Sequence, residues 1–175
     1  MIDSCQIRDV IKEDLLMLLT WRNHPNVRRH MFTQHEIGLE EHLSWFAKVS
    51  VDASRRSLII EEEHQPIGFV QLSQVERDGV CNWGFYVKPN APQGTGIKLG
   101  ISVLNYAFEH LKLHKICGQA LETNHVSNGF HQRMGFKLEG ILRKQQRIEM
   151  HYQDLHCYGL LATEWAAIKL RQESL

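Results

Sequence analysis

Apolar and polar residues follow two different periods along the first half of this chain. Apolar residues at alternate positions, bounded by turn residues, predict strands, whereas Leu and aromatic residues at helical spacing predict helices. Pro25 and its polar neighbours interrupt the pattern between two helices. The predicted elements are a strand at 5–10, helices at 13–22 and 38–49, and strands at 57–61, 66–75 and 80–87, with turns at 62–65 and 77–79.

The second half contains the clearest helix of the sequence. It spans 97–113, where apolar residues recur at intervals of three and four positions. Gly135 follows a shorter helix at 127–134, as glycine often does just past a helix C-terminus. The remaining predictions are strands at 115–122, 136–148 and 151–162 and a terminal helix at 163–171.

This order of elements predicts a mixed α/β fold with helices on both faces of one sheet, in a single domain over 1–175. Three consecutive strands are expected to be antiparallel, and the long helix to connect 80–87 to 115–122 as a parallel crossover. A ligand site is expected near the carboxyl ends of those two strands. We find no internal repeat or low-complexity tract.

Composition narrows the possible partners. Lys plus Arg and Asp plus Glu number 20 each, so net charge gives no reason to expect nucleic acid or an anionic membrane. The four cysteines are far apart in sequence, which disfavours zinc and a disulfide framework, and we predict no metal. The acidic start and the lack of a long apolar run predict a cytoplasmic protein that does not enter a membrane.

A glycine loop, Gln93-Gly94-Thr95-Gly96, precedes the clearest helix. Unpaired backbone N–H groups at a helix start attract phosphate, glycines let the main chain approach it, and Lys98 adds a positive charge. The loop matches neither the P-loop nor the dinucleotide fingerprint. Taken alone, it is also compatible with a tight turn whose glycines serve only the backbone geometry.

The wider context resembles the GCN5-related N-acetyltransferase family. A strand ending in GFYV, a proline, Q-G-T-G before a long helix, then Asn124, Ser127 and Gly135-Phe136 follow in that family's order. The resemblance implies a mostly antiparallel seven-stranded sheet whose central strands splay to admit acetyl-coenzyme A as co-substrate. It also implies a set of cofactor-binding residues: Phe85, Tyr86, Val87, Gln93, Gly94, Thr95, Gly96, Ile97, Lys98, Asn124 and Ser127.

Acetyl transfer to an amine needs a base, a donor to the carbonyl oxygen and an acid near the sulfur. In the family, a backbone N–H of the strand before the loop, here around 85–87, serves the carbonyl. His131 occupies the place where the family usually has a tyrosine acid; the alternative is a surface histidine. Glu122 is a candidate base, with His30 and His35 as competitors, or merely a solvated carboxylate.

The segment from Trp21 to Met31, with the later Trp45, resembles within this family the acetyltransferases that modify the 4-amine of a UDP-linked 4-amino-4,6-dideoxy-N-acetyl-hexose in pseudaminic acid synthesis, an intermediate for flagellin glycosylation. Guanidinium groups suit a diphosphate and apolar side chains suit a 6-deoxy sugar. The candidate substrate-binding residues are Trp21, Arg22, Arg28, Arg29 and Met31; core packing and a solvated Arg pair are the alternatives.

Two other functions remain open at this point. Acetyltransferases of ribosomal-protein N-termini share W-R-N-like starts and E-G-x-x-R endings, here Glu139-Gly140 through Arg143. A non-catalytic sensor would keep the coenzyme site without turnover. We expect small-molecule partners and a possible homodimer.

Overall fold

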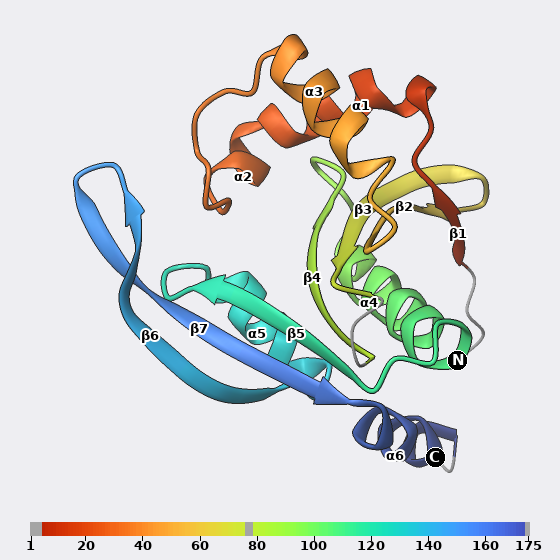
Figure 1. Cartoon of the computed structure of the whole chain (residues 1–175). Coiled ribbons are helices and arrows are strands. Elements are labelled where there is room, and N and C mark those ends of the chain that lie inside the picture. Colours follow the sequence, from red (N-terminus) through yellow and green to blue (C-terminus); the bar gives the residue numbers. More distant parts are fainter. Residues whose placement is uncertain (1–4, 76–78, 174–175) are drawn as a thin grey trace.

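The computed structural model describes residues 5–75 and 79–173, and its strands form one seven-stranded sheet in the order β1-β2-β3-β4-β5-β7-β6 (Figure 1). The strands are β1 (Cys5–Asp9), β2 (Arg55–Glu62), β3 (Gln65–Ser73), β4 (Val80–Val87), β5 (Lys115–Leu121), β6 (Lys137–Ile148) and β7 (His151–Leu161). All seven strands agree with the predicted bounds within two residues at each end, and the mixed α/β class is confirmed.

The helices lie in the chain between and after the strands. They are η1 (Lys12–Asp14), α1 (Leu15–Asn23), α2 (Pro25–Arg28), α3 (Leu39–Val49), α4 (Thr95–Asn105), η2 (Tyr106–His110), α5 (His125–Arg133) and α6 (Ala162–Glu173). None of the helices in the described ranges is long and apolar enough to cross a membrane.

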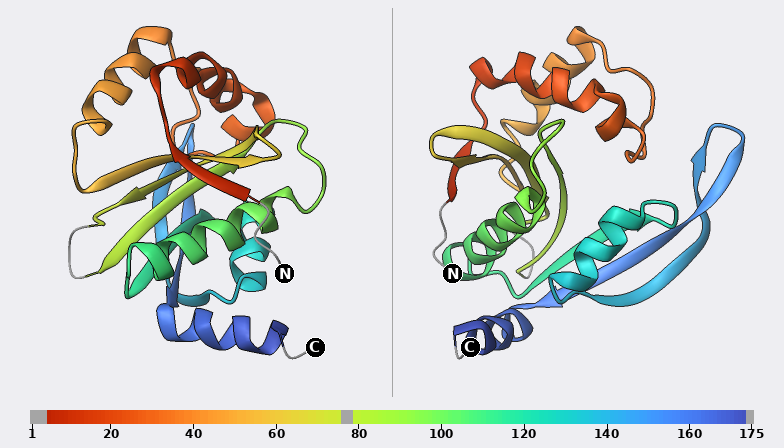
Figure 2. Two further views of the ribbon diagram at one scale, coloured as in Figure 1. Left: turned by 90° about the vertical axis from the view of Figure 1, so that its right-hand side faces the viewer. Right: turned by 180° about the vertical axis from the view of Figure 1, so that it is seen from behind.

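Two layers of helices cover opposite faces of the sheet (Figure 2). Alternation along β2 explains the division: Leu58 and Ile60 pack in the large cluster that includes α4 residues, whereas Ile59 packs with Leu15 and Leu18 of α1. Trp21 and Trp45 pack against this smaller cluster, so α1 and α3 cover one face. Met134 and Trp165 join the large cluster, which places α5 and α6 with α4 on the other.

The central strands separate soon after they begin to pair. β4 and β5 run parallel, as the crossover prediction required, and all other neighbouring strands are antiparallel. The pairing of β4 with β5 covers only Val80–Asn82 and Lys115–Cys117. Beyond these residues both strands continue without a partner on that edge, which confirms the predicted splay and leaves a gap through the sheet (Figure 1).

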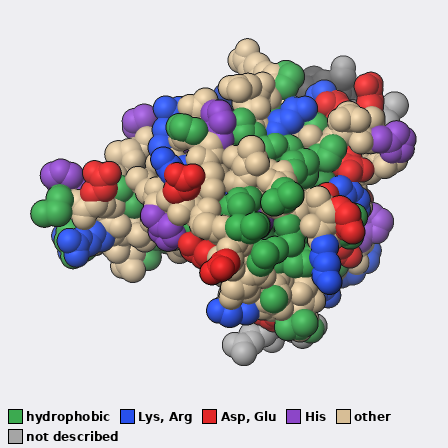
Figure 3. All heavy atoms as spheres, turned by 90° about the horizontal axis from the view of Figure 1, so that it is seen from above, with side chains coloured by type: hydrophobic (Ala, Val, Ile, Leu, Met, Phe, Trp, Pro, Cys, Tyr) green, Lys and Arg blue, Asp and Glu red, His purple; other side chains and the backbone are tan. Residues whose placement is uncertain are grey.

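Two groups of exposed apolar residues lie on the β6–β7 hairpin and on the helices of the upper layer. The β6–β7 hairpin extends away from the body of the molecule (Figure 1). Its outer strand exposes Leu138, Ile141 and Leu142. Seen from above, hydrophobic side chains also gather over the helices of the upper layer, where Leu16 and Leu43 are exposed (Figure 3). The expected homodimer stays a prediction, as does the single domain over 1–175.

Some predicted boundaries were wrong. The helix expected over 97–113 begins at Thr95 and its α-helical part ends at Asn105, after which a π-helical turn carries the chain to His110. The segment expected only as a break contains α2, whose start is set by Pro25 at its first position and by the Nδ1 atom of His24, which accepts from the Asn26 N–H at 3.2 Å. The turn expected at 77–79 lies largely outside the described residues.

Candidate active site

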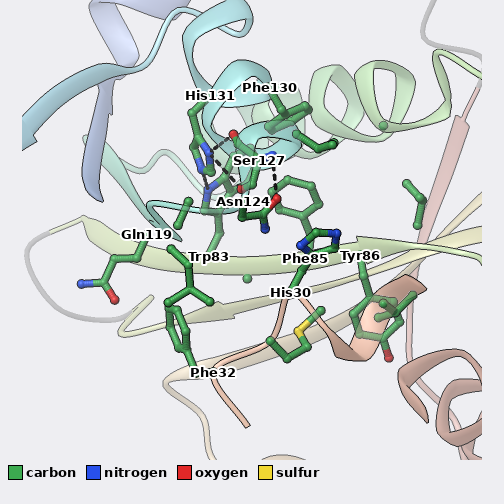
Figure 4. A pocket seen from close by; sticks show the side chains of 18 of the residues that line it. His30, Phe32, Trp83, Phe85, Tyr86, Gln119, Asn124, Ser127, Phe130 and His131 are labelled. Carbon is green, nitrogen blue, oxygen red and sulfur yellow. Dashed lines mark hydrogen bonds between the residues drawn. The ribbon is translucent and has the colours of Figure 1, made fainter. Parts of the chain in front are cut away.

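The gap between β4 and β5 holds a cavity of about 540 Å³, a volume typical of small-molecule sites (Figure 4). Its walls are residues 82–87 of β4, residues 117 and 119–121 of β5, and side chains at the start of α5. Residues 26, 27 and 29–32 of α2 and the following loop close it on the opposite face of the sheet. The cavity therefore connects both faces, so two ligands can approach one another from opposite sides.

The glycine loop lies at one end of this cavity, where Gly96 contributes to the lining. Gly94 is the N-cap of α4 and has φ +92°, a left-handed conformation that favours glycine. A Cβ added to Gly94 meets nothing within 4 Å, and one added to Gly96 meets only Val87 Cγ1 at 4.0 Å. The space that these missing side chains leave, at the N-terminus of an eleven-residue helix, fits a phosphate group.

Thr95 in the loop and Lys98 in α4 both have partners within the protein. Thr95 is buried, and its hydroxyl donates to the Pro92 carbonyl oxygen at 2.8 Å, so its side chain fixes the loop from inside. Lys98 forms an ion pair with Glu62 and does not line the cavity. Gln93, Gly94 and Ile97 are also absent from the lining, to which Gly96 contributes. The fit to phosphate therefore rests on the left-handed backbone of Gly94 and the open space beside Gly94 and Gly96.

The backbone of β4 presents amide groups to the gap. The N–H of Lys88 donates to the Ile67 carbonyl of β3 at 2.9 Å. Because successive N–H groups of a strand point to opposite edges, those of Phe85 and Val87 point toward β5, with which they have no ladder pairing. The Tyr86 amide points to β3 instead. The prediction of a donor around 85–87 is thus narrowed to two amides.

His131 is not the surface residue that was considered; it is 1% exposed and bridges α5 to β4. Its Nε2 accepts from Trp83 Nε1–H at 3.2 Å, because an indole can only donate, and its Nδ1 therefore carries the proton and contacts the Ser127 carbonyl at 2.8 Å (Figure 4). Burial lowers the pKa of His131, and the Ser127 contact opposes this only in part. The ring is neutral at pH 7 with both nitrogens engaged.

The role of His131 as the acid therefore stays a prediction. To donate a proton to the sulfur, His131 would have to break one of its two buried hydrogen bonds. The ring also stacks on Tyr158, with centroids 4.8 Å apart and an interplanar angle of 7°. Gly118 of β5 makes room for the bridge: a Cβ there would lie 2.4 Å from His131 Nε2 and 2.7 Å from Trp83 Nε1. Sequence reasoning missed Gly118 and Trp83, because only the fold brings them to His131.

Asn124 and Asn128 organise the start of α5. Asn124 is the N-cap, and its side-chain oxygen accepts from the Ser127 N–H at 3.0 Å. Asn128, which the sequence analysis did not single out, donates to the Leu121 carbonyl at 2.9 Å and accepts from the Tyr158 hydroxyl at 2.7 Å. Asn124 and Ser127 both line the cavity.

Glu122 lies outside the cavity lining, and its carboxylate accepts from the Asp154 N–H of β7 at 3.3 Å. The structure therefore gives no support to Glu122 as the base. His35 is exposed and pairs with Glu41 at 3.0 Å, also away from the lining. His30, the third candidate, does line the cavity.

The predicted substrate residues divide into two groups. Arg29 and Met31 line the cavity, whereas Trp21, Arg22 and Arg28 do not. Arg22 donates from Nη2 to the Thr33 carbonyl at 2.7 Å, and its Nη1 is buried without a hydrogen-bond partner among the described residues. Arg28 lies 3.7 Å from Glu36.

The W-R-N segment thus holds the loop that follows α2. The side chain of Asn23 makes two hydrogen bonds with the backbone of Ile37, each 2.8 Å long, and Arg22 holds Thr33. Trp21 anchors the segment in the smaller cluster. These residues position the cavity wall and do not form it.

The described part of the chain, residues 5–75 and 79–173, contains no group of three or more His, Cys, Asp or Glu that could hold a metal ion.

Comparisons with known proteins point to one family. A family model described as an acetyltransferase (GNAT) domain matches residues 5–137. The acetyltransferase PseH of Campylobacter jejuni subsp. jejuni (serotype O:23/36, strain 81-176) is 28% identical over 138 residues, which are 79% of this chain and 86% of that protein. An uncharacterized prophage-derived N-acetyltransferase of Bacillus subtilis, YokL, is 25% identical over 113 residues, 63% of each chain.

Solved structures resemble the fold closely. The spermidine N-acetyltransferase of Vibrio cholerae, in a complex with CoA and spermine, superposes with a TM-score of 0.86 and 22% identity, covering 94% of this chain and 99% of that one. A dodecameric form of a spermidine N-acetyltransferase from the same organism has a TM-score of 0.77 and 21% identity, covering 94% of this chain and 97% of that one. At these identities the likeness concerns the fold.

Proposed function

Because the chain belongs to the GNAT family of acetyltransferases and is an acetyl-CoA-dependent N-acetyltransferase, we propose that its acceptor is the 4-amine of a UDP-linked 4-amino-4,6-dideoxy-N-acetyl-hexose. The proposal follows the W-R-N segment and the resemblance to PseH over most of the chain. Its physical support comes from the lining of the cavity.

The co-substrate fits the side of the cavity formed by β4, α4, β5 and α5. The backbone of Gly94 and Gly96 would hold the diphosphate, and the free edges of β4 and β5 would hold the pantetheine amides. When bound, acetyl-CoA supplies a thioester whose carbonyl carbon accepts the amine. The amides of Phe85 and Val87 then provide donors for the carbonyl oxygen.

The choice of acceptor is supported mainly by the lack of carboxylates among the described lining residues. None of the described residues that line the cavity is Asp or Glu, whereas Arg29 places a guanidinium at the α2 side. A polyamine carries several positive charges and requires acidic partners, so this lining disfavours it. A diphosphate suits Arg29, and Val27, Met31 and Phe32 offer apolar contacts for a 6-methyl group or a uracil ring.

A thiol-release assay with three acceptors side by side tests the proposal. We expect release of CoA with the UDP-linked amino sugar, and rates at least tenfold lower with an N-terminal peptide of a ribosomal protein and with spermidine. Activity with the peptide and none with the nucleotide sugar would move the assignment to ribosomal-protein N-termini. Acetyl-CoA binding without turnover of any acceptor would favour the non-catalytic sensor.

A further inference from the structure

We propose that His30 is the base that takes a proton from the acceptor amine, and that Arg29 covers the basic nitrogen of His30 until an anionic acceptor draws the guanidinium away. The first part rests on acetyl transfer to an amine; the second rests also on the proposed nucleotide-sugar acceptor.

The other titratable groups of the cavity are unsuited to this role. The titratable side chains among the described lining residues are Arg29, His30, Tyr86, Cys117 and His131. Burial raises the pKa of Tyr86 and of Cys117, so both stay protonated at pH 7. His131 uses both ring nitrogens in its bridge, and Arg29 is a permanent cation. Of these lining groups, this leaves His30, a neutral ring whose Nε2 is held by an exposed contact with Arg29 and not by a buried bridge.

The position of His30 suits proton transfer near the thioester. Its ring comes from the loop after α2 and points across the cavity toward Phe85 and Asn124 (Figure 4). The Phe85 amide is one of the two donors that face the gap, so the ring and the expected carbonyl oxygen site lie at the same part of the cavity. Burial, and secondarily the positive charge of Arg29, lowers the pKa of His30, which keeps a lone pair available at pH 7.

Arg29 occupies that lone pair in the present structure. Arg29 Nε donates to His30 Nε2 at 3.1 Å, so the neutral ring carries its proton on Nδ1. The Arg29 side chain is exposed and lines the cavity on the side proposed for the diphosphate. When the guanidinium binds a diphosphate bidentately, Nε2 becomes free for the amine.

The proton balance of the step is simple. The acceptor ammonium gives one proton to His30 Nε2, and the neutral amine attacks the thioester carbonyl carbon. The N–C bond forms, the C–S bond breaks, and the second amine proton ends on the thiol of CoA. His30 releases its proton to solvent, so each turnover yields the amide, CoA and one proton.

Replacement of His30 tests the base. With the UDP-linked amino sugar as acceptor, His30→Gln is expected to lower kcat/KM at pH 7 by about 100-fold, the order typical of a lost general base, while acetyl-CoA affinity stays unchanged. The loss should shrink at high pH, where the amine is already deprotonated, because the activity of the variant then follows the ionisation of the acceptor amine alone. His35→Gln, on the same loop and outside the cavity, is the matched control and should keep wild-type rates. Equal kcat/KM for wild type and His30→Gln overturns the proposal.

A second measurement keeps the proposal testable if the acceptor assignment fails. NMR titration of the His30 ring needs no turnover: Arg29→Gln should raise the pKa of His30, because it removes both a hydrogen-bond donor and a neighbouring cation. An unchanged His30 pKa in this variant would overturn the Arg29 contact. If the nucleotide sugar is not acetylated by the wild type, the proposed acceptor fails, and the His30 comparison is made with whichever of the peptide or spermidine turned over.

Discussion

The two walls of the cavity are built by different means. The cofactor wall, made of β4, the start of α4, β5 and α5, presents backbone: two amides of β4, the glycines of the loop and the free edge of β5. The acceptor wall, residues 26, 27 and 29–32, presents side chains, and Arg22 and Asn23 hold the following loop in place from outside the lining. A backbone site depends on where the sheet opens, whereas a side-chain site depends on local clamps. We therefore expect mutations in the cofactor wall to weaken acetyl-CoA binding, and mutations in the acceptor wall to weaken acceptor binding.

The largest expected effect is at the glycine loop. Gly94→Trp places a bulky side chain in the space proposed for the diphosphate, at a φ that only glycine adopts easily. We expect acetyl-CoA affinity to fall more than 100-fold, measured by calorimetric titration. Gly38→Trp is the control: Gly38 also has open space around it but lies outside the cavity lining and has φ −75°.

A milder variant guards against misfolding. Gly96→Ala adds a methyl group that meets only Val87 Cγ1, so the fold should persist while affinity for acetyl-CoA falls by about tenfold, or about 1.4 kcal/mol. Unchanged affinity in both loop variants would remove the loop from the cofactor wall.

His131→Ala should mainly destabilise the cofactor wall. The change empties a buried site and leaves the Trp83 indole N–H without its acceptor, so we expect the free energy of unfolding to fall by about 3 kcal/mol. Chemical denaturation of this variant beside His151→Ala, an exposed histidine of β7, measures the difference. A loss of activity without a loss of stability would restore the acid role to His131.

The same residue predicts a pH dependence of stability. Because the pKa of His131 is lower in the folded than in the unfolded protein, the unfolded state binds more protons below about pH 6.5. Stability should thus be full above that pH and decrease as the pH falls below it. Denaturation at pH 7.5 and 5.5 should show a smaller decrease for His131→Ala than for the wild type.

Asn23→Ala tests the acceptor wall. The variant loses two hydrogen bonds to the Ile37 backbone, so the loop that carries His30 and Met31 should lose order. We expect KM for the acceptor to rise by about tenfold with acetyl-CoA affinity unchanged. Thr33→Ala, which leaves intact the carbonyl that Arg22 contacts, is the matched control. A parallel loss of acetyl-CoA affinity would show that the two walls are not independent.

Gly129→Ala should have the smallest effect and the opposite sign. Gly129 is inside α5, has nothing within 4 Å of an added Cβ, and does not line the cavity. Alanine should stabilise the protein by about 0.5–1 kcal/mol without changing either substrate constant. Thermal unfolding checks the first part and steady-state kinetics the second.

The contrast between the walls also explains what the sequence could predict. The order of elements, the parallel crossover and the glycine loop follow from local periodicity and from motifs that are contiguous in the chain. The roles of Arg22 and Asn23 did not, because an arginine that holds a carbonyl eleven residues away and one that binds a diphosphate look alike in sequence. Gly118 and Asn128 were missed for the same reason: their partners are distant in sequence and meet only through the sheet.

The close fit of Gly118 beneath the Trp83–His131 bridge limits which substitutions these three positions can accept during evolution. Any larger residue at 118 pushes the two rings apart, and the tyrosine usual in the family at 131 would present a hydroxyl where Trp83 now finds an acceptor nitrogen. Single exchanges at 83, 118 or 131 are therefore penalised, and relatives that differ here should have exchanged these positions jointly.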